Sequence, residues 1–285
     1  MINYLKKNKE KILNLSLKKI YRHFFLNNIT PTGYYSYLKD LIFEFLQSKY
    51  PSYKKEDFEE KIDKLISEAD DYRNLNDELN VLFNPRFNED LEFHYKYQES
   101  YIFFRFITYS MNIKLISDKY AQVYNFAINN LNQPLDILEI GGGLPHGLIY
   151  NVWKKNKTFL ENFTYVDANL LHSEFVKWYC KKIKIVHDIK LFRSSKTPIL
   201  ENRKFNFVFA KDIFEHLDAP EILIDFLISN TKNDKTLLCL DLEHKGEKTV
   251  QHISPNLPVL KDRLIKNNFK VIKEFKEIHV WKKIN

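Results

Sequence analysis

The chain has 285 residues, of which 44% are hydrophobic and 28% are charged, so it is long enough for a globular domain with its own core plus a second element. Its net charge of +7 is compatible with an anionic partner, but the early run of lysines is more typical of a solvated helix face. The two cysteines, Cys180 and Cys239, exclude a disulfide framework and predict a cytoplasmic protein, and no apolar run reaches the roughly 20 residues of a membrane span.

Residues 1–125 show helical periodicity and no convincing strand, which predicts an all-helical subdomain that acts as a lid or shapes the substrate site. Amphipathic patterns cover residues 34–50, 54–72 and 89–116. The first of them places six apolar side chains on one stripe: Tyr37, Leu38, Leu41, Ile42, Phe45 and Leu46. Several tyrosines could surround a cation or a sugar ring, although an aromatic stripe at helical spacing is more typical of core packing. They are Tyr34, Tyr35, Tyr37, Tyr95, Tyr97 and Tyr101.

From about residue 126 onward, short apolar runs alternate with helical stretches. The runs predict strands at residues 136–140, 163–167, 183–187, 205–210, 236–242, 269–275 and 278–283. Only Lys276 and Glu277 separate the last two runs, which is too short for a crossover helix and predicts an antiparallel hairpin. The predicted fold class is α/β: a seven-stranded, mostly parallel Rossmann-like sheet over residues 126–285, with the N-terminal helical subdomain before it.

Three consecutive glycines, Gly141, Gly142 and Gly143, follow the first predicted strand and precede a helix. This arrangement lets backbone N–H groups at a helix start approach a ligand closely. A dinucleotide fingerprint would need a glycine where His146 stands, and no phosphate-loop Lys-Ser or Lys-Thr pair follows. The loop therefore predicts a nucleotide site of another kind.

Acidic residues lie next to three predicted strand ends. Glu139 comes two residues before the first glycine, Asp167 ends the second strand and Asp188 follows the third. Carboxylates at this edge suit a ligand that offers hydrogen-bond donors, such as an amino group, ribose hydroxyls and an exocyclic amine.

Over residues 130–285 the chain resembles the class I S-adenosylmethionine (SAM)-dependent methyltransferases. The resemblance lies in the runs LEIGGG, YVDAN, HDI and FNFVFAKDIFEHLDAPEILIDFL. The resemblance implies SAM as cofactor, with the glycines along its methionine and ribose and Glu139 supporting its amino end. It implies Asp167 on the ribose hydroxyls and Asp188 on the adenine amine, with Ile189 or a nearby apolar group against the ring. The full implied cofactor set is Glu139, Gly141, Gly142, Gly143, Asp167, Ala168, Asp188, Ile189, Lys211 and Asp212.

Several histidines are candidates for chemistry. His216, just after the fourth predicted strand, is the candidate catalytic base, with a structural contact as the alternative. His146 follows Pro145, where the family commonly has glycine, and either approaches the sulfonium or caps the helix. His244 and His252 lack the short spacing of metal ligands, so no metal is predicted.

The resemblance implies a methyltransferase that acts on a small molecule or glycan by O- or N-methylation; the EIGGG form of the loop is similar to that of sugar methyltransferases. Two alternatives stay open: a SAM-using enzyme that transfers the aminocarboxypropyl arm or cyclises, and a non-catalytic nucleotide-binding scaffold. The run AKDIF lacks the Asp/Asn-Pro-Pro segment that grips a flipped base, which disfavours DNA as a substrate. RNA and a homodimer both remain open.

Overall fold

The computed structural model describes residues 33–67, 118–141, 143–155, 157–192, 196–201, 203–231, 235–243, 253–254 and 256–284. In the N-terminal part it contains α2 (Tyr34–Lys49) and α3 (Lys55–Ser67), which correspond to the first two amphipathic patterns. α2 buries the predicted stripe, except that Tyr34 replaces Tyr37 on the buried face. The rings of Phe43 and Phe58, with centroids 5.6 Å apart, join the two helices. The third pattern, at 89–116, lies outside the described residues.

The described residues belong to two compact units, with α2 and α3 in the first and everything from Lys119 onward in the second. Helix α8 (Asp118–Leu131) spans the boundary that the sequence predicts between residues 125 and 126. It packs on the sheet through Tyr124, whose ring centroid lies 4.8 Å from that of Phe207. The role of the preceding helices as a lid stays a prediction.

The second unit is built on a seven-stranded sheet in the order β3-β2-β1-β4-β5-β7-β6. Its strands are β1 (Leu135–Ile140), β2 (Leu160–Asp167), β3 (Val186–Leu191), β4 (Phe207–Ala210), β5 (Leu237–Asp241), β6 (Phe269–Phe275) and β7 (Ile278–Lys283). The first five strands pair in parallel, whereas β7 pairs antiparallel with both β5 and β6. The predicted fold class and its C-terminal hairpin are confirmed.

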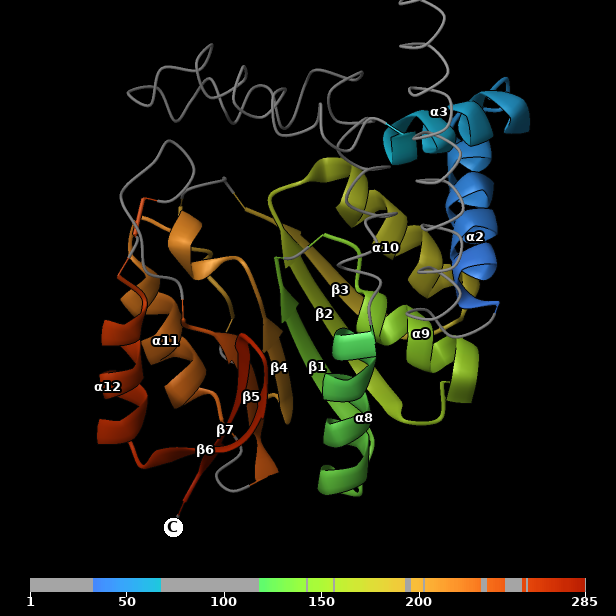
Figure 1. Cartoon of the computed structure of the whole chain (residues 1–285). Coiled ribbons are helices and arrows are strands. Elements are labelled where there is room, and N and C mark those ends of the chain that lie inside the picture. The colour runs from blue at the N-terminus through green and yellow to red at the C-terminus, as the bar shows by residue number, and fades with distance from the viewer. Residues whose placement is uncertain are drawn as a thin grey trace, which may run out of the picture. The chain divides into compact units, whose positions relative to one another are not determined.

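Helices cover both faces of this sheet, with α8, α9 and α10 on one side and α11 and α12 on the other (Figure 1). Their bounds are α9 (His146–Lys155), α10 (Leu170–Lys182), α11 (Pro220–Ser229) and α12 (Pro258–Lys266). Proline begins α11 and α12, where its missing N–H has no intrahelical partner to lose. The side chain of Asn169 caps α10 by accepting from the His172 N–H at 3.1 Å. Among the described residues, no helix is long and apolar enough to cross a membrane.

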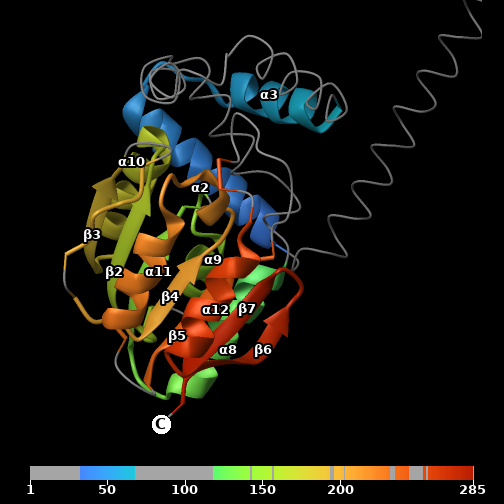
Figure 2. The same ribbon diagram turned by 90° about the vertical axis from the view of Figure 1, so that its left-hand side faces the viewer.

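The two faces of the sheet differ in chemistry. Figure 2 is viewed from the side of α11 and α12, whose helices cover an apolar face. That face is built from Leu138, Ile140, Val166, Val208, Ala210, Leu238 and Leu240, against Leu223, Ile224, Leu227, Leu260 and Leu264. Since successive strand residues point to opposite faces, the residues between these belong to the α8 side, where Glu139 and Asp167 are buried. The buried carboxyl groups nearest the carboxyl ends of β1 and β2, those of Glu139 and Asp167, therefore both lie on the α8 face.

Candidate functional site

The loop after β1 needs glycine at two positions, for reasons that involve the protein's own side chains. Gly141 and Gly143 have φ values of 67° and 75°, a region that other residues seldom adopt. A Cβ on Gly141 would lie 3.0 Å from Ile213 in the turn after β4, and one on Gly143 would lie 3.3 Å from the His172 ring. The glycines thus let the loops after β1 and β4 meet at the carboxyl edge of the sheet. Gly142 lies outside the described residues.

Gly147 serves a different purpose, in the first turn of α9. A Cβ there would overlap the Tyr124 ring and would come within 3.0 Å of the Tyr120 carbonyl oxygen. The absence of a side chain at Gly147 therefore allows α8 and α9 to approach each other closely. It also leaves Tyr124 in position to reach the sheet.

Tyr124 donates its hydroxyl hydrogen to the Oε2 atom of Glu139, which is buried in the middle of the α8 face. Burial raises the pKa of Glu139 to about 8, and the charge of Asp167 adds to this, while the Tyr124 hydrogen bond acts in the opposite direction. Glu139 is therefore largely protonated at neutral pH in this state. Its predicted role at the amino end of a cofactor stays a prediction.

The raised pKa of Glu139 predicts how stability depends on pH. The folded chain keeps a proton on Glu139 up to a pKa of about 8, whereas the unfolded chain loses it near 4.5, so the free energy of unfolding should fall as pH rises between these values. The fall is up to about 1.4 kcal/mol per pH unit. In denaturant titrations from pH 5 to 8, Glu139→Gln should lose less stability than wild type. The exposed Glu161→Gln variant is the control and should follow wild type; equal slopes for all three proteins would refute the assignment.

Asp167 ends β2 and has its carboxyl group beside the glycine loop. Its Oδ1 accepts from the Asn169 N–H at 2.7 Å, and its Oδ2 lies 2.7 Å from the Tyr165 hydroxyl. The Tyr165 hydroxyl also lies 2.6 Å from the Gly143 carbonyl oxygen. Burial raises the pKa of Asp167 to about 6, although N–H groups of Asn169, Gly143 and Ala168 and the Tyr165 hydroxyl stabilise its ionised form.

Strand register explains why these groups gather. Glu139 pairs directly with Tyr165 on β2 and with Phe209 on β4. Paired residues, and alternate residues along one strand, share a face of the sheet. Glu139, Tyr165 and Asp167 therefore project to the α8 side, with Asp167 at the carboxyl edge and Glu139 below it.

Asp188 does not join this group, which corrects the predicted strand boundary. The sequence predicts a strand at 183–187 with Asp188 after it, but β3 spans Val186–Leu191 and Asp188 lies within it, paired with Thr164. Asp188 is thus about 10 Å back from the level of Asp167, at about 3.3 Å per residue, and projects to the other face. Its Oδ2 lies 3.5 Å from the Lys190 ammonium. Ile189, paired with Tyr165, does share the face of Asp167.

Lys211 and Asp212, directly after β4, form an ion pair with Nζ and Oδ2 2.5 Å apart. The Lys211 ammonium also lies 5.4 Å from the centre of the Tyr120 ring on α8. Burial works to lower the pKa of Lys211, but the charges and hydrogen bonds of Tyr120 and Asp212 outweigh it and raise the pKa overall, so Lys211 stays cationic. On the next strand, burial, with the charges of Asp212 and Glu215, raises the pKa of Asp241 to about 6.

His216 lies in the short 3-10 helix η1 (Phe214–His216), which follows Lys211 and Asp212 in the chain. Its side chain is 34% exposed, and its Nε2 lies 4.0 Å from the Glu215 carboxylate. The backbone N–H of Ser254, which follows β5, donates to the Glu215 carbonyl at 3.1 Å. This placement at the carboxyl edge is where a base would be needed, and catalysis by His216 stays a prediction.

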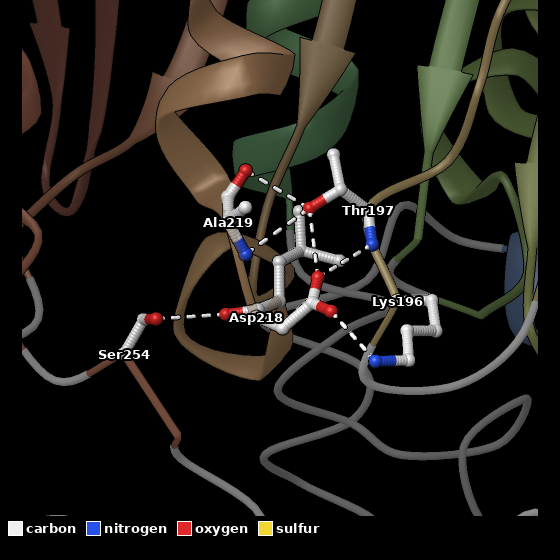
Figure 3. A network of polar contacts seen from close by, with 6 residues as sticks. Lys196, Thr197, Asp218, Ala219 and Ser254 are labelled. Atoms are coloured by element: carbon white, nitrogen blue, oxygen red, sulfur yellow. Dashed lines mark hydrogen bonds and ion pairs between the residues drawn. The ribbon is translucent and has the colours of Figure 1, made fainter.

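A polar network joins the loops after β3, β4 and β5 around η1 (Figure 3). The Asp218 carboxylate accepts from the Thr197 N–H at 3.0 Å and pairs with the Lys196 ammonium at 2.9 Å. The Ser254 hydroxyl donates to the Leu217 carbonyl oxygen at 2.7 Å. These bonds hold the residues of η1 and those that follow it, through Asp218 from the loop after β3 and through Leu217 from the loop after β5. They give the carboxyl edge a defined backbone at the position of His216.

Two other predicted histidines, His244 and His252, lie outside the described residues. His146 begins α9 and is buried. Within the described part of the chain, no group of three or more His, Cys, Asp or Glu side chains could hold a metal ion.

The strand order β3-β2-β1-β4-β5-β7-β6, with β7 antiparallel, decides the architecture. It is the class I methyltransferase fold. No protein-family model and no curated protein matches the chain.

Among solved structures, a SAM-dependent methyltransferase from Aquifex aeolicus is 15% identical, covers 70% of this chain and 98% of its own, and has a TM-score of 0.40. One from Clostridium acetobutylicum is 11% identical, covers 59% of this chain and 92% of its own, and has a TM-score of 0.41. TehB from Haemophilus influenzae is 12% identical, covers 57% and 62%, and also has a TM-score of 0.41.

Sequence reasoning missed Tyr124, Tyr165 and Asp241. Tyr165 precedes Asp167 by two, and the two-residue period of a strand could have placed both on one face. Asp241 ends its strand as Asp167 does. Tyr124 carries no such local signal, except that an isolated glycine in a helix, here Gly147, indicates a close neighbour.

Proposed function

We propose that the chain is a SAM-dependent methyltransferase acting on a small molecule or glycan through O- or N-methylation. The observation that carries the proposal is the Asp167 carboxyl group at the end of β2, hydrogen-bonded through Tyr165 to the glycine loop after β1. Ligands of open parallel sheets bind outside the carboxyl ends of the strands, where the order of connection reverses. In this sheet β1 lies at that reversal, between β2 and β4.

The residues present fit an adenosyl sulfonium. A carboxylate accepts two hydroxyl donors with charge-assisted bonds, so Asp167 would hold the ribose diol. Gly141 and Gly143, both at positive φ, would offer bare main chain beside it. Ile189 shares this face, whereas Asp188 projects to the other one, so the proposed nucleoside site retains Ile189 and omits Asp188.

When bound, the cofactor supplies a methyl group on an already activated leaving group. The chain's own contribution is therefore mainly proximity and orientation, which can supply several kcal/mol of the barrier. Lys211 directly follows β4, Asp241 ends β5 and His216 lies in η1 after β4, so these three residues would face the acceptor. An acceptor hydroxyl needs a base to take its proton, and the imidazole of His216, 34% exposed in η1, would serve as that base. The similarity of the EIGGG loop to that of sugar methyltransferases supports an oxygen nucleophile.

Calorimetric titration with SAM and, in parallel, NAD tests the cofactor. We expect SAM to bind with a micromolar dissociation constant, as enzyme ligands commonly do, and NAD to bind far more weakly. An acceptor panel of sugars, phenols and amines then tests the reaction. S-adenosylhomocysteine as product supports methyl transfer, methylthioadenosine indicates the aminocarboxypropyl reaction instead, and SAM binding without any product indicates a scaffold. Stronger binding of NAD than of SAM would overturn the proposal.

A further inference from the structure

The Tyr165 hydroxyl lies between two acceptors at hydrogen-bond distance. Its oxygen is 2.6 Å from the carbonyl oxygen of Gly143 and 2.7 Å from Oδ2 of Asp167. Both are normal distances for a hydroxyl hydrogen bond. The ring is buried and stacked beside that of Phe163, with centroids 6.2 Å apart, so the hydroxyl is held in place.

One hydroxyl has one hydrogen, and that hydrogen makes one strong bond at a time. If Asp167 is ionised, Tyr165 donates to the carboxylate and the short contact with the Gly143 carbonyl lacks a proton of its own. If Asp167 is protonated on Oδ2, it donates to Tyr165, and Tyr165 donates to Gly143. Two strong bonds at these two distances therefore require a second proton, and Asp167 is the group of the three that can carry it.

We propose that Tyr165 is a positioning residue that relays hydrogen bonds between the Asp167 carboxyl and the Gly143 carbonyl, so that one proton couples the ribose acceptor to the conformation of the glycine loop. In the protonated state the chain of bonds ties the loop to β2. In the ionised state Tyr165 turns its hydrogen to Asp167, which then accepts the ribose hydroxyls. This inference rests on the proposed function for the identity of the ligand, but the relay itself is a property of the ligand-free chain.

The surroundings of Asp167 favour such a proton. Burial raises the pKa of Asp167 to about 6. From β1, Glu139 is directly across from Tyr165 and, being mostly neutral at pH 6, adds little negative charge there. Among the described residues, the polar groups toward this side include the Tyr124 hydroxyl, which donates to Glu139, the His172 ring beside Gly143, and the N–H groups of Gly143, Ala168 and Asn169. On β3, Asp188 and Lys190 pair with Thr164 and Val166 and so project to the opposite face.

The sign of the pH dependence follows. Two ribose hydroxyl donors need the ionised carboxylate, so binding releases the proton wherever Asp167 holds one. Affinity should be constant above the pKa of Asp167, about 6, and should fall by up to tenfold per pH unit below it. Replacing Tyr165 by Phe removes a bond that is stronger to the ionised carboxylate than to the neutral one, so the midpoint should move upward by about one pH unit.

Carbon-13 NMR of the side-chain carboxyl of Asp167 tests the relay without any ligand, with the resonance assigned by its loss in Asp167→Asn. In wild type we expect a midpoint near 6, and in Tyr165→Phe a midpoint about one unit higher. Tyr124→Phe is the matched control. It also removes a tyrosine hydroxyl from the α8 face of the sheet, but that hydroxyl donates to Glu139 and not to Asp167. Its Asp167 midpoint should stay within a few tenths of the wild-type value.

A wild-type midpoint below about 4.5, near the ordinary value of a carboxyl group, would overturn the relay even if no variant folds. An unmoved midpoint in folded Tyr165→Phe would do the same, because a merely structural tyrosine affects stability and not the Asp167 titration. SAM affinity measured from pH 5 to 8 separates the two proposals. A shifted NMR midpoint with no SAM binding at any pH leaves the relay standing and removes the cofactor assignment.

Discussion

Gly147→Ala is expected to lower the free energy of unfolding by about 2 to 4 kcal/mol, the sum of an overpacking cost and a lost bond to a buried carboxyl group. On an ordinary helix the same substitution would stabilise the protein by up to about 1 kcal/mol, so even the sign is informative. The reason is local: a Cβ at Gly147 would overlap the Tyr124 ring, and Tyr124 is the donor to Glu139. Denaturant titration at pH 7 measures the change.

A double-mutant cycle with Tyr124→Ala isolates the steric part of this effect. Tyr124→Ala alone is destabilising because it opens a cavity and leaves Glu139 without its donor. In that background the added methyl group at Gly147 has room, so Gly147→Ala should then cost less than about 1 kcal/mol. If Gly147→Ala costs the same free energy of unfolding with Tyr124 and with Tyr124→Ala, then α8 and α9 do not pack through Gly147 and Tyr124.

The contrast between Gly147 and the preceding glycines shows what a sequence can predict about this site. A run of three glycines after an apolar strand indicates a loop at the edge of a sheet, and the loop is there. The side chains that require those glycines, Ile213 at Gly141 and Tyr124 at Gly147, lie far away in sequence. Periodicity and turn chemistry are local, so they predict where a backbone turns but not which distant side chain fills the space beside it.

The placement of Asp188 has a related cause. Apolar and polar residues mostly alternate over residues 183–191. The strand could therefore begin and end a few residues earlier or later without disturbing that pattern. The pairing of Asp188 with Thr164 and of Leu191 with Asp167 is set by the neighbouring strand. Because side chains alternate between faces, such a shift decides both the depth of a residue and the face to which it projects. Asp167, at the last position of a long strand, is less sensitive to this uncertainty.

Asp167→Asn is expected to weaken SAM binding by about 10- to 100-fold, since it removes the charge from one or two hydrogen bonds to the ribose. The same substitution at Asp188 is the matched control and should change the dissociation constant less than about twofold, because Asp188 projects to the other face of the sheet. Calorimetric titration at pH 7.5, above the pKa of Asp167, measures both. Circular dichroism on each variant verifies that the fold is retained.

A change in the ligand separates recognition of the ribose from a general disturbance of the loop. For wild type, S-adenosylhomocysteine should bind more tightly than its 2′-deoxy analogue by about 3- to 10-fold, the value of one hydrogen bond. In Asp167→Asn the preference for the 2′-hydroxyl ligand should largely vanish, because the group that accepts the hydroxyl's hydrogen bond has lost its charge. A preference that survives the substitution, or a loss that appears at Asp188 instead, means that another group holds the ribose. Either result would remove Asp167, and with it the loop it is bonded to, from the centre of the site.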